Sequence, residues 1–328
     1  MKILCTLPMD PAGLALLDPA VEVVVAPDAG AETLYKMIGD ADFLVVRNQL
    51  PADLFERPNR LLGVIRHGVG IDLIPVESAT AQAIPVANVP GSNAQAVVEY
   101  CISSFLSLAR PIGRMDTVLR SAGWAPARAQ TANATELAGK TAGIVGLGAI
   151  GAGLARLCKH GFGMRVLGFQ RNPRNMPDFV ESVDLDTLLS TSDFVSLNCP
   201  LTPATRHLLN ADRLRRMKPG AVIVNAARGP VIDEQALVIA LRENWIRGAA
   251  LDVFSNQPLA PDHPLLKLDN VLLTPHVAGI TVESSRAMGI GTARQIVQLM
   301  AGERPEHLVN TEVWDRYLAR RRALGQRP

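Results

Sequence analysis

The sequence predicts an α/β protein with two domains, each built on a parallel sheet. The chain has 328 residues, of which 48% are hydrophobic, and this is long enough for two cores of about 150 residues each. Short apolar runs alternate with helical stretches over residues 1–90, and a second series of this kind begins near residue 143. Strands that alternate with helices pair in parallel, because each helix returns the chain to the same end of the sheet.

The first series starts at the N-terminus. Asp10 followed by Pro11 places a capping side chain before a proline at the first helical position, which predicts a helix over Ala12–Leu17. A second helix is expected over Ala31–Ile38. The strands of this series are expected at Ile3–Cys5, Val21–Val25, Phe43–Val46, Leu61–Ile65 and Ile84–Val86.

The second series is bracketed by two long helical patterns, from about Ser92 to Leu119 and from Val282 to Met300. Between the first of these and the first strand, Ser121 to Ala138 is rich in Ala, Gly, Pro and Thr and predicts a connecting loop. The strands of this series are expected at Gly143–Val145, Val166–Phe169, Phe194–Leu197, Val222–Asn225, Ala249–Asp252 and Val271–Thr274. We therefore expect a discontinuous first domain, residues 1–96 and 290–328, and a second domain, residues 97–289.

Charge and cysteine usage exclude several classes of protein. The formal net charge is only +2, which gives no reason to expect a nucleic-acid or membrane partner. The C-terminal residues form a basic tail with Arg316, Arg320, Arg321, Arg322 and Arg327. We interpret this tail as the solvated end of a terminal helix. The four cysteines are scattered without a C-x-x-C pair, so we expect reduced thiols and no metal site. An apolar run of three residues near the N-terminus is too short for a signal peptide, which favours a cytoplasmic protein.

A glycine-rich motif, G-x-G-x-x-G, spans residues 146–151. Gly146, Gly148 and Gly151 follow an apolar strand and, with Ala149 and Ile150, open a helix expected over Ala152–His160. In this context the glycines permit a tight turn, approach of a pyrophosphate and close packing of helix on strand. The alternative is a strand-to-helix turn with no ligand. The motif predicts a Rossmann-type, doubly wound domain that binds a dinucleotide.

The residues after the next strand bear on the choice of cofactor. An acidic side chain there binds the ribose 2′-hydroxyl of NAD and repels the 2′-phosphate of NADP. This chain has Gln170, Arg171 and, close behind, Arg174. Guanidinium groups suit a phosphate by charge and by bidentate geometry. We therefore predict NADP in preference to NAD; the alternative is that the arginines are merely solvated.

Five motifs occur in order along the chain: residues 143–151, 199–205, 225–229, 249–253 and 273–276. Together they resemble the D-isomer-specific 2-hydroxyacid dehydrogenase family over nearly the whole chain. The resemblance implies a Rossmann-type domain plus a smaller flavodoxin-like α/β substrate domain, an active site between them, and a homodimer.

The family pattern also implies roles for single residues. Arg228 should hold the substrate carboxylate and carbonyl oxygen, and His276 should be the acid/base. Such a pair is what a 2-oxo acid requires: a cation for its carboxylate and a titratable donor for its carbonyl. The cofactor is expected to contact Cys199, Pro200 and Thr205 on its adenine side and Ala226, Asp252 and Gly279 on its nicotinamide side. In the first domain the substrate is expected to meet Arg47 and the backbone N–H groups of Val69 and Gly70.

One residue departs from the family pattern: Gln257 stands where the carboxylate partner of the histidine is usual. A neutral amide can orient the imidazole by a hydrogen bond but supplies no charge to favour the imidazolium. The main prediction is an NADP-preferring 2-hydroxyacid dehydrogenase that acts as a 2-oxoacid reductase on a small anionic substrate. Formate dehydrogenases of this family are similar in carrying glutamine here, so a formate- or phosphite-type dehydrogenase is one alternative. A non-catalytic, nucleotide-sensing binding protein is the other.

Overall fold

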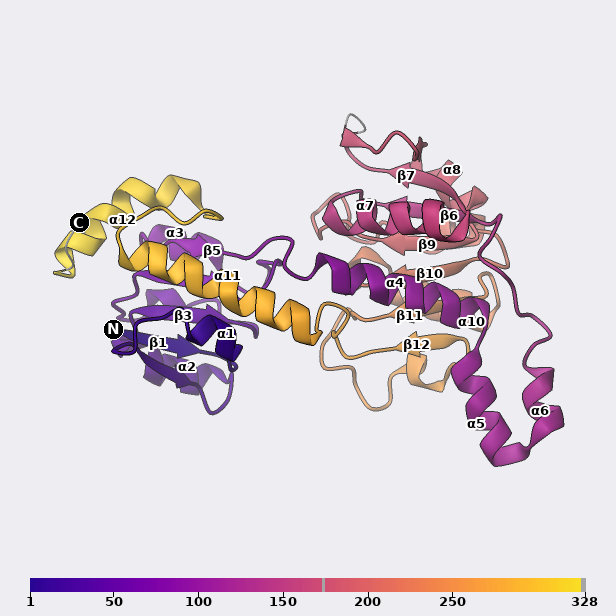
Figure 1. The fold of residues 1–328 in the computed structure, drawn as a ribbon, viewed down its shortest axis with the longest axis horizontal. Helices are drawn as coiled ribbons and strands as arrows, with labels where there is room; N and C mark the ends of the chain where they lie inside the picture. Colours follow the sequence, from indigo (N-terminus) through magenta and orange to yellow (C-terminus); the bar gives the residue numbers. More distant parts are fainter. Residues whose placement is uncertain (173–174, 326–328) are drawn as a thin grey trace. The chain divides into compact units, whose positions relative to one another are not determined.

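The computed structural model describes residues 1–172 and 175–325. The chain divides into unit 1, Met1–Asn93 with Ile280–Pro328, and unit 2, Ala94–Gly279 (Figure 1). The boundaries drawn from the sequence lie at 96/97 and 289/290. The second differs because helix α11, Val282–Met300, is unbroken and contacts helix α1, Pro11–Leu14, and strand β4, Gly63–Arg66, of unit 1. A Cβ at Gly13 of α1 would overlap the backbone of Gly289, and a Cβ at Gly289 would lie 2.9 Å from Cβ of Asp10.

Unit 1 is built on five parallel strands in the order β2-β1-β3-β4-β5. Alternate strand residues point to opposite faces, so that Ile3 and Phe43 pack toward α1 and α11 while Leu4 and Leu44 pack toward helices α2 and α3. This strand order is that of flavodoxin-like folds, and it confirms the fold class predicted for the smaller domain. The elements are β1 Lys2–Cys5, β2 Glu22–Val25, α2 Ala31–Met37, β3 Phe43–Val46, β4 Gly63–Arg66, α3 Val76–Ala81 and β5 Val86–Ala87.

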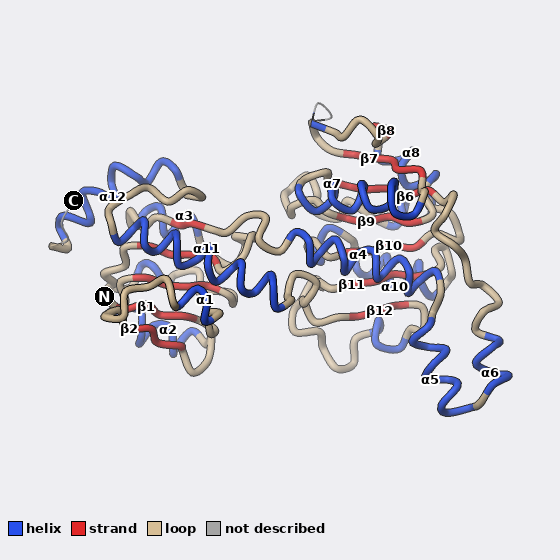
Figure 2. Tube along the Cα trace, in the orientation of Figure 1, coloured by secondary structure: helices blue, strands red, loops and turns tan. Residues whose placement is uncertain are grey.

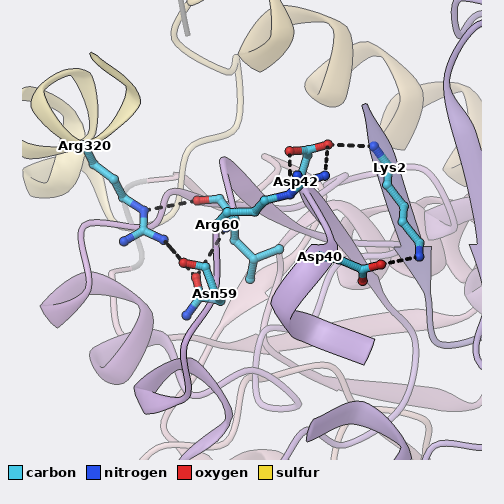
Figure 3. Close-up of polar contacts among 7 residues, drawn as sticks. Lys2, Asp40, Asp42, Asn59, Arg60 and Arg320 are labelled. Carbon is cyan, nitrogen blue, oxygen red and sulfur yellow. Dashed lines mark hydrogen bonds and ion pairs between the residues drawn. The ribbon is translucent and has the colours of Figure 1, made fainter. Parts of the chain in front are cut away.

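The basic tail corrects the sequence interpretation, because it is not simply solvated. It forms helix α12, Trp314–Ala323, in which Arg321 is buried and donates to the carbonyl oxygens of Leu299 and Met300 at the end of α11, both at 2.7 Å. Arg320 donates to the side chain of Asn59 at 2.8 Å. The next residue, Arg60, pairs with Asp42, as Figure 3 shows. Guanidinium donors satisfy carbonyl groups that a helix end leaves unpaired.

Unit 2 is built on seven parallel strands in the order β12-β11-β10-β9-β6-β7-β8. This is the doubly wound order of Rossmann folds, as predicted. Helices α4 and α7 lie side by side on one face of the sheet, where Gly153 packs against Val98 (Figure 2), and α8, α9 and α10 cover the other face. The strands are β6 Thr141–Val145, β7 Arg165–Phe169, β8 Glu181–Ser182, β9 Phe194–Leu197, β10 Val222–Asn225, β11 Gly248–Leu251 and β12 Val271–Leu273. The helices are α4 Ala94–Ala109, α7 Ala149–Arg156, α8 Leu185–Thr191, α9 Ala211–Arg216 and α10 Glu234–Arg242.

Two expectations for the segment before β6 were wrong. The long helix predicted to Leu119 is interrupted at Pro111, which lacks the N–H group needed to continue a helix and disfavours helical backbone at the preceding residue. A second helix, α5, then spans Ile112–Ala122 and buries none of its side chains. The segment predicted as a loop contains helix α6, Trp124–Ala129. In Figure 1, α5 and α6 project away from the sheet of unit 2.

The nineteen residues of α11 include Glu283, Arg286 and Arg294. Within residues 1–172 and 175–325, no helix is both long and apolar enough to cross a membrane.

Candidate active site

The three glycines of the motif after β6 have different surroundings. Gly146 has a φ of +88°, and a Cβ atom there would lie 2.8 Å from the carbonyl oxygen of Asn198. A Cβ at Gly151 would overlap the carbonyl oxygen of Gly146. At Gly148, by contrast, none of the described atoms lies within 4 Å of a Cβ position. The chain's own packing therefore requires the first and third glycines, while the second leaves open space in which a ligand can approach the backbone.

Helix α7 begins directly after Gly148, with Ala149 and Ile150 in its first turn. Gly148 has no side chain with which to cap the first N–H groups of the helix. Such N–H groups, together with the positive end of the helix dipole, bind phosphate. The residues present therefore fit the pyrophosphate of a dinucleotide.

The segment after β7 carries the side chains predicted to recognise the adenine ribose. Gln170 donates its amide N–H to the carbonyl oxygen of Asn172 at 2.8 Å. The side chain of Arg171 is exposed. Arg174 lies outside the described residues. Their role toward the cofactor stays a prediction.

The loop after β9 is closed by one hydroxyl group. Thr205 accepts from the backbone N–H of Thr202 at 2.7 Å and donates to the carbonyl oxygen of Pro200 at 2.6 Å. Burial raises the pKa of the Cys199 thiol, so this cysteine stays protonated and is a poor nucleophile. These hydrogen bonds fix the backbone of the loop, and its place beside the adenine stays a prediction.

The turn after β10 carries Arg228. Asn225, at the end of the strand, accepts from the N–H of Ala227 at 3.1 Å and donates to the carbonyl oxygen of Arg228 at 3.0 Å, with Ala226 between them. The next residue, Gly229, lies against the backbone of Phe254, and a Cβ there would overlap the carbonyl group of Phe254. The missing side chain thus places the Arg228 turn directly beside the segment that follows β11.

Asp252 follows β11 and is 1% exposed. One of its carboxylate oxygens accepts from the Thr274 hydroxyl at 2.6 Å and from the N–H of Val277 at 2.8 Å. The other oxygen accepts from the N–H of Ala278 at 2.8 Å. The carbonyl oxygen of Asp252 accepts from the N–H of His276 at 2.9 Å. This residue therefore organises the turn at His276, and its predicted contact with the nicotinamide, like that of Gly279, stays a prediction.

His276 has a φ of +58° and an exposed side chain. Its Nδ1 lies 3.0 Å from Oε1 of Gln257. Because an amide oxygen only accepts hydrogen bonds, Nδ1 carries the proton in this pair. Nε2 is then unprotonated in the neutral ring, and the predicted acid/base role of His276 stays a prediction.

Unit 1 contains the three residues predicted to contact substrate there. Arg47 donates to the carbonyl oxygen of Pro8 at 2.9 Å, and burial lowers its pKa. Val69 and Gly70 lie in a turn whose backbone is held by the side chain of Arg66. Arg66 donates to the carbonyl oxygens of Gly70, Val46 and His67 at 2.8–2.9 Å. The sequence offered no sign of this role for Arg66, because its partners are backbone atoms.

His67 is a second residue that sequence reasoning passed over. It is 2% exposed, and neither ring nitrogen has a hydrogen-bond partner among the described residues. Burial and the nearby Arg47 guanidinium lower the pKa of His67 to about 4. The imidazole is therefore neutral at pH 7.

The fold and the glycine motif place the chain in a class, the dinucleotide-binding oxidoreductases with a doubly wound sheet. The family model of the D-isomer specific 2-hydroxyacid dehydrogenase NAD binding domain matches residues 102–278. The chain belongs to this family. It is an NAD(P)-dependent 2-hydroxyacid dehydrogenase or reductase, an oxidoreductase that acts on CH–OH groups.

Individual relatives show how far the likeness extends. The chain is 39% identical over 323 residues to a glyoxylate reductase of Thermofilum pendens, covering 95% of each protein. It resembles the NADPH-dependent glyoxylate/hydroxypyruvate reductase of Sinorhizobium meliloti, solved with NADP and malonate, with a TM-score of 0.82, 30% identity and 94% and 96% of the two chains covered. It also resembles the NAD-dependent formate dehydrogenase of Staphylococcus aureus, solved with NAD, with a TM-score of 0.85, 27% identity and 94% and 99% covered.

The buried His67 predicts a pH dependence of stability. In the unfolded chain its pKa returns to 6.5, so between pH 6.5 and 4 the unfolded state binds more protons than the folded state. The free energy of unfolding should therefore fall as pH falls through this window, by up to about 1.4 kcal/mol per pH unit for one group. In His67→Leu this part of the slope should disappear, as urea titrations across the window would show. Parallel pH dependences in the two proteins would contradict the assignment.

Proposed function

We propose that this protein is an NADP(H)-preferring reductase of small 2-oxo acids, which transfers hydride between nicotinamide and C2. The observation that carries the proposal is the 3.0 Å contact between Gln257 Oε1 and His276 Nδ1. It holds an imidazole in the tautomer whose Nε2 can exchange a proton, on a turn organised by Asp252. The contact between Gly229 and Phe254 joins the turn that carries Arg228 to the segment after β11 that carries Gln257.

The chain's own residues account for every step other than hydride transfer. When bound, a reduced nicotinamide supplies a hydride to C2 of the substrate. Arg228 binds the substrate carboxylate and carbonyl oxygen and stabilises the negative charge that develops on that oxygen. Nε2–H of imidazolium His276 donates the proton that completes the hydroxyl group. Gln257 accepts from Nδ1–H throughout and so keeps the ring in one orientation. In the oxidative direction neutral Nε2 accepts the hydroxyl proton.

The substrate class follows from the charges offered. Arg228 and Arg47 provide two cations, and the Val69–Gly70 turn provides backbone N–H groups, all suited to a small anionic 2-oxo acid. The relatives named above include reductases of glyoxylate and hydroxypyruvate. These two acids are the substrates we propose to examine first.

The preference for NADP(H) is proposed from the segment after β7. Gln170 presents a neutral amide where a carboxylate would repel the 2′-phosphate, and the exposed Arg171 can pair with that phosphate. The S. meliloti reductase, which resembles this chain, is described as NADPH-dependent.

Gln257 itself favours a second candidate, a formate-type dehydrogenase. Oxidation of formate transfers a hydride and needs no proton acceptor, so a histidine paired with a neutral amide is sufficient. The likeness to the S. aureus formate dehydrogenase is in keeping with this candidate. Reduction of NAD by formate, measured beside reduction of 2-oxo acids, separates the two functions.

A homodimer is proposed from the α5–α6 arm. Ile112 and Trp124 are 67% and 72% exposed, and Leu119 is 43% exposed. An arm that buries none of the α5 side chains in its own unit gains most by covering them on a second copy.

The function predicts consumption of NADPH in the presence of glyoxylate or hydroxypyruvate. Arg228→Ala should lower kcat/KM on the order of 10²-fold or more, because a bidentate charge-assisted contact is lost, while NADPH binding persists. Arg216→Ala, an exposed arginine paired with Asp186, is the matched control and should leave turnover unchanged. Near-normal turnover of the Arg228 variant would place the carboxylate site elsewhere.

The cofactor assignment predicts a higher kcat/KM with NADPH than with NADH. Arg171→Ala should reduce that ratio on the order of tenfold or more, since one charge-assisted hydrogen bond to the 2′-phosphate is removed. Arg165→Ala, at the other end of β7 and paired with Glu181, should leave the ratio as it is. An unchanged ratio in the Arg171 variant would refute the assignment.

The amide at position 257 predicts how pH controls reduction. Reductive kcat/KM needs imidazolium, so it should fall as pH rises through the apparent pKa of His276. Gln257→Glu puts a carboxylate beside the ring and should move this fall upward by about one pH unit, less at high salt because the pair is exposed. Superimposable pH profiles would show that the side chain at position 257 does not control the imidazole.

The arm predicts a dimer at micromolar concentration. Trp124→Asp should weaken the dimer, because it would bury a charge in an apolar interface. Light scattering of the two proteins measures this directly. A monomeric mass for the unaltered chain would refute the dimer.

A further inference from the structure

The segment that carries Gln257 is held by a carboxylate with no part in the reaction described above. Glu234 is the first residue of α10, and its side chain is 19% exposed. Its Oε2 accepts from the backbone N–H of Ser255 at 3.0 Å. Its Oε1 lies 3.3 Å from Nε2 of His263. Ser255 precedes Gln257 and His263 follows it, so one carboxylate holds the segment on both sides of the amide.

The hydrogen-bond directions at His263 are defined by its other nitrogen. Nδ1 accepts from the backbone N–H of Leu265 at 3.3 Å. Nδ1 is therefore unprotonated in the neutral ring, and Nε2–H donates to Glu234. His263 is 20% exposed, so this contact is partly shielded from water.

Glu234 also joins this segment to the turn that carries Arg228. The chain runs from Arg228 through Gly229 into α10, whose N-terminus is capped by Asp233. Gly229 contacts the backbone of Phe254, and Glu234 binds the N–H of the next residue, Ser255. Two adjacent contacts thus fix the backbone beside Arg228 to the backbone that leads to Gln257.

Gln257 needs such support because its own side chain is exposed. A single hydrogen bond between exposed groups contributes only about 1 kcal/mol, since water competes for both partners. An amide on a loosely held loop would leave Nδ1 of His276 often bonded to water instead. The ring could then adopt the other tautomer, in which Nε2 carries the proton of the neutral form and cannot accept one.

We propose that Glu234, together with His263, is a positioning residue that keeps Oε1 of Gln257 against Nδ1 of His276. Glu234 acts through Gln257 and touches neither substrate nor cofactor. The proposal rests on the proposed function for its effect on turnover, but its effect on the imidazole is independent of turnover.

The direct experiment measures the tautomer of His276 in the full chain by ¹⁵N NMR of histidine-labelled protein at a pH where the ring is neutral. The signal is assigned with His276→Gln. Nδ1–H should predominate in the unaltered chain and in Glu234→Gln, whose amide oxygen still accepts from Ser255. In Glu234→Ala the population should shift toward Nε2–H. Glu243→Gln, at the other end of α10, is the matched control and should match the unaltered chain.

A tautomer ratio in Glu234→Ala equal to that of the unaltered chain would overturn the proposal. A shift of the same size in Glu243→Gln would also overturn it, because any loss of charge on α10 would then suffice. Neither result depends on substrate. An unaltered chain that reduces no 2-oxo acid would contradict the proposed function, while the NMR result would still decide the role of Glu234.

Steady-state kinetics distinguish a positioning role of Glu234 from a general contribution of Glu234 to the stability of the fold. Glu234→Ala should lower kcat for oxidation of the 2-hydroxy acid, the direction in which neutral Nε2 accepts the proton, about tenfold, a part of the roughly 10²–10⁴-fold that acid–base catalysis contributes, with the KM for NADP unchanged. In a Gln257→Ala background the same substitution should lower kcat no further, because its effect passes through Gln257. Equal losses in both backgrounds would show that Glu234 acts by another route and overturn the proposal.

Discussion

A carboxylate at the end of β11 accepts three hydrogen bonds from the segment that follows β12. Asp252 is almost completely buried, and a buried carboxylate is costly unless donors surround it. Thr274, Val277 and Ala278 supply those donors. The turn they form holds His276 in left-handed backbone, a conformation that costs a residue other than glycine roughly 1–3 kcal/mol. Without these hydrogen bonds the imidazole would have no defined place, and Gln257 would have nothing to orient.

The other site residues of unit 2 depend on parallel strands that end at the same edge of the sheet. The loops after β6, β9, β10 and β11 each leave this edge, where ligands of doubly wound sheets bind. Contacts that exclude a side chain hold these loops together: Gly146 lies against Asn198, and Gly229 lies against Phe254. The loops therefore reach fixed positions by backbone packing, and Arg228 lies on one of the turns fixed in this way.

Much of the fold followed from the sequence, because alternating strands and helices and the glycine motif are local patterns. The interruption at Pro111 was missed because apolar residues continue on both sides of it. The basic tail was misinterpreted because the carbonyl partners of Arg320 and Arg321 lie far away in the chain. In the site, residues within motifs were open to prediction. The support from Arg66 and Glu234 was not, since it consists of hydrogen bonds to backbone groups, which no pattern of side chains marks.

The central claim is that Asp252 orders the turn that presents His276, and hydrogen exchange of the backbone amides of Val277 and Ala278 tests it most directly. In Asp252→Asn the side-chain NH₂ cannot accept a hydrogen bond, so at least one of these amides loses its acceptor. We expect their exchange to accelerate by tenfold or more in a chain that is still folded, together with a loss of turnover. Exchange at the rate of the unaltered protein would contradict the account, because the turn would then be ordered without the carboxylate.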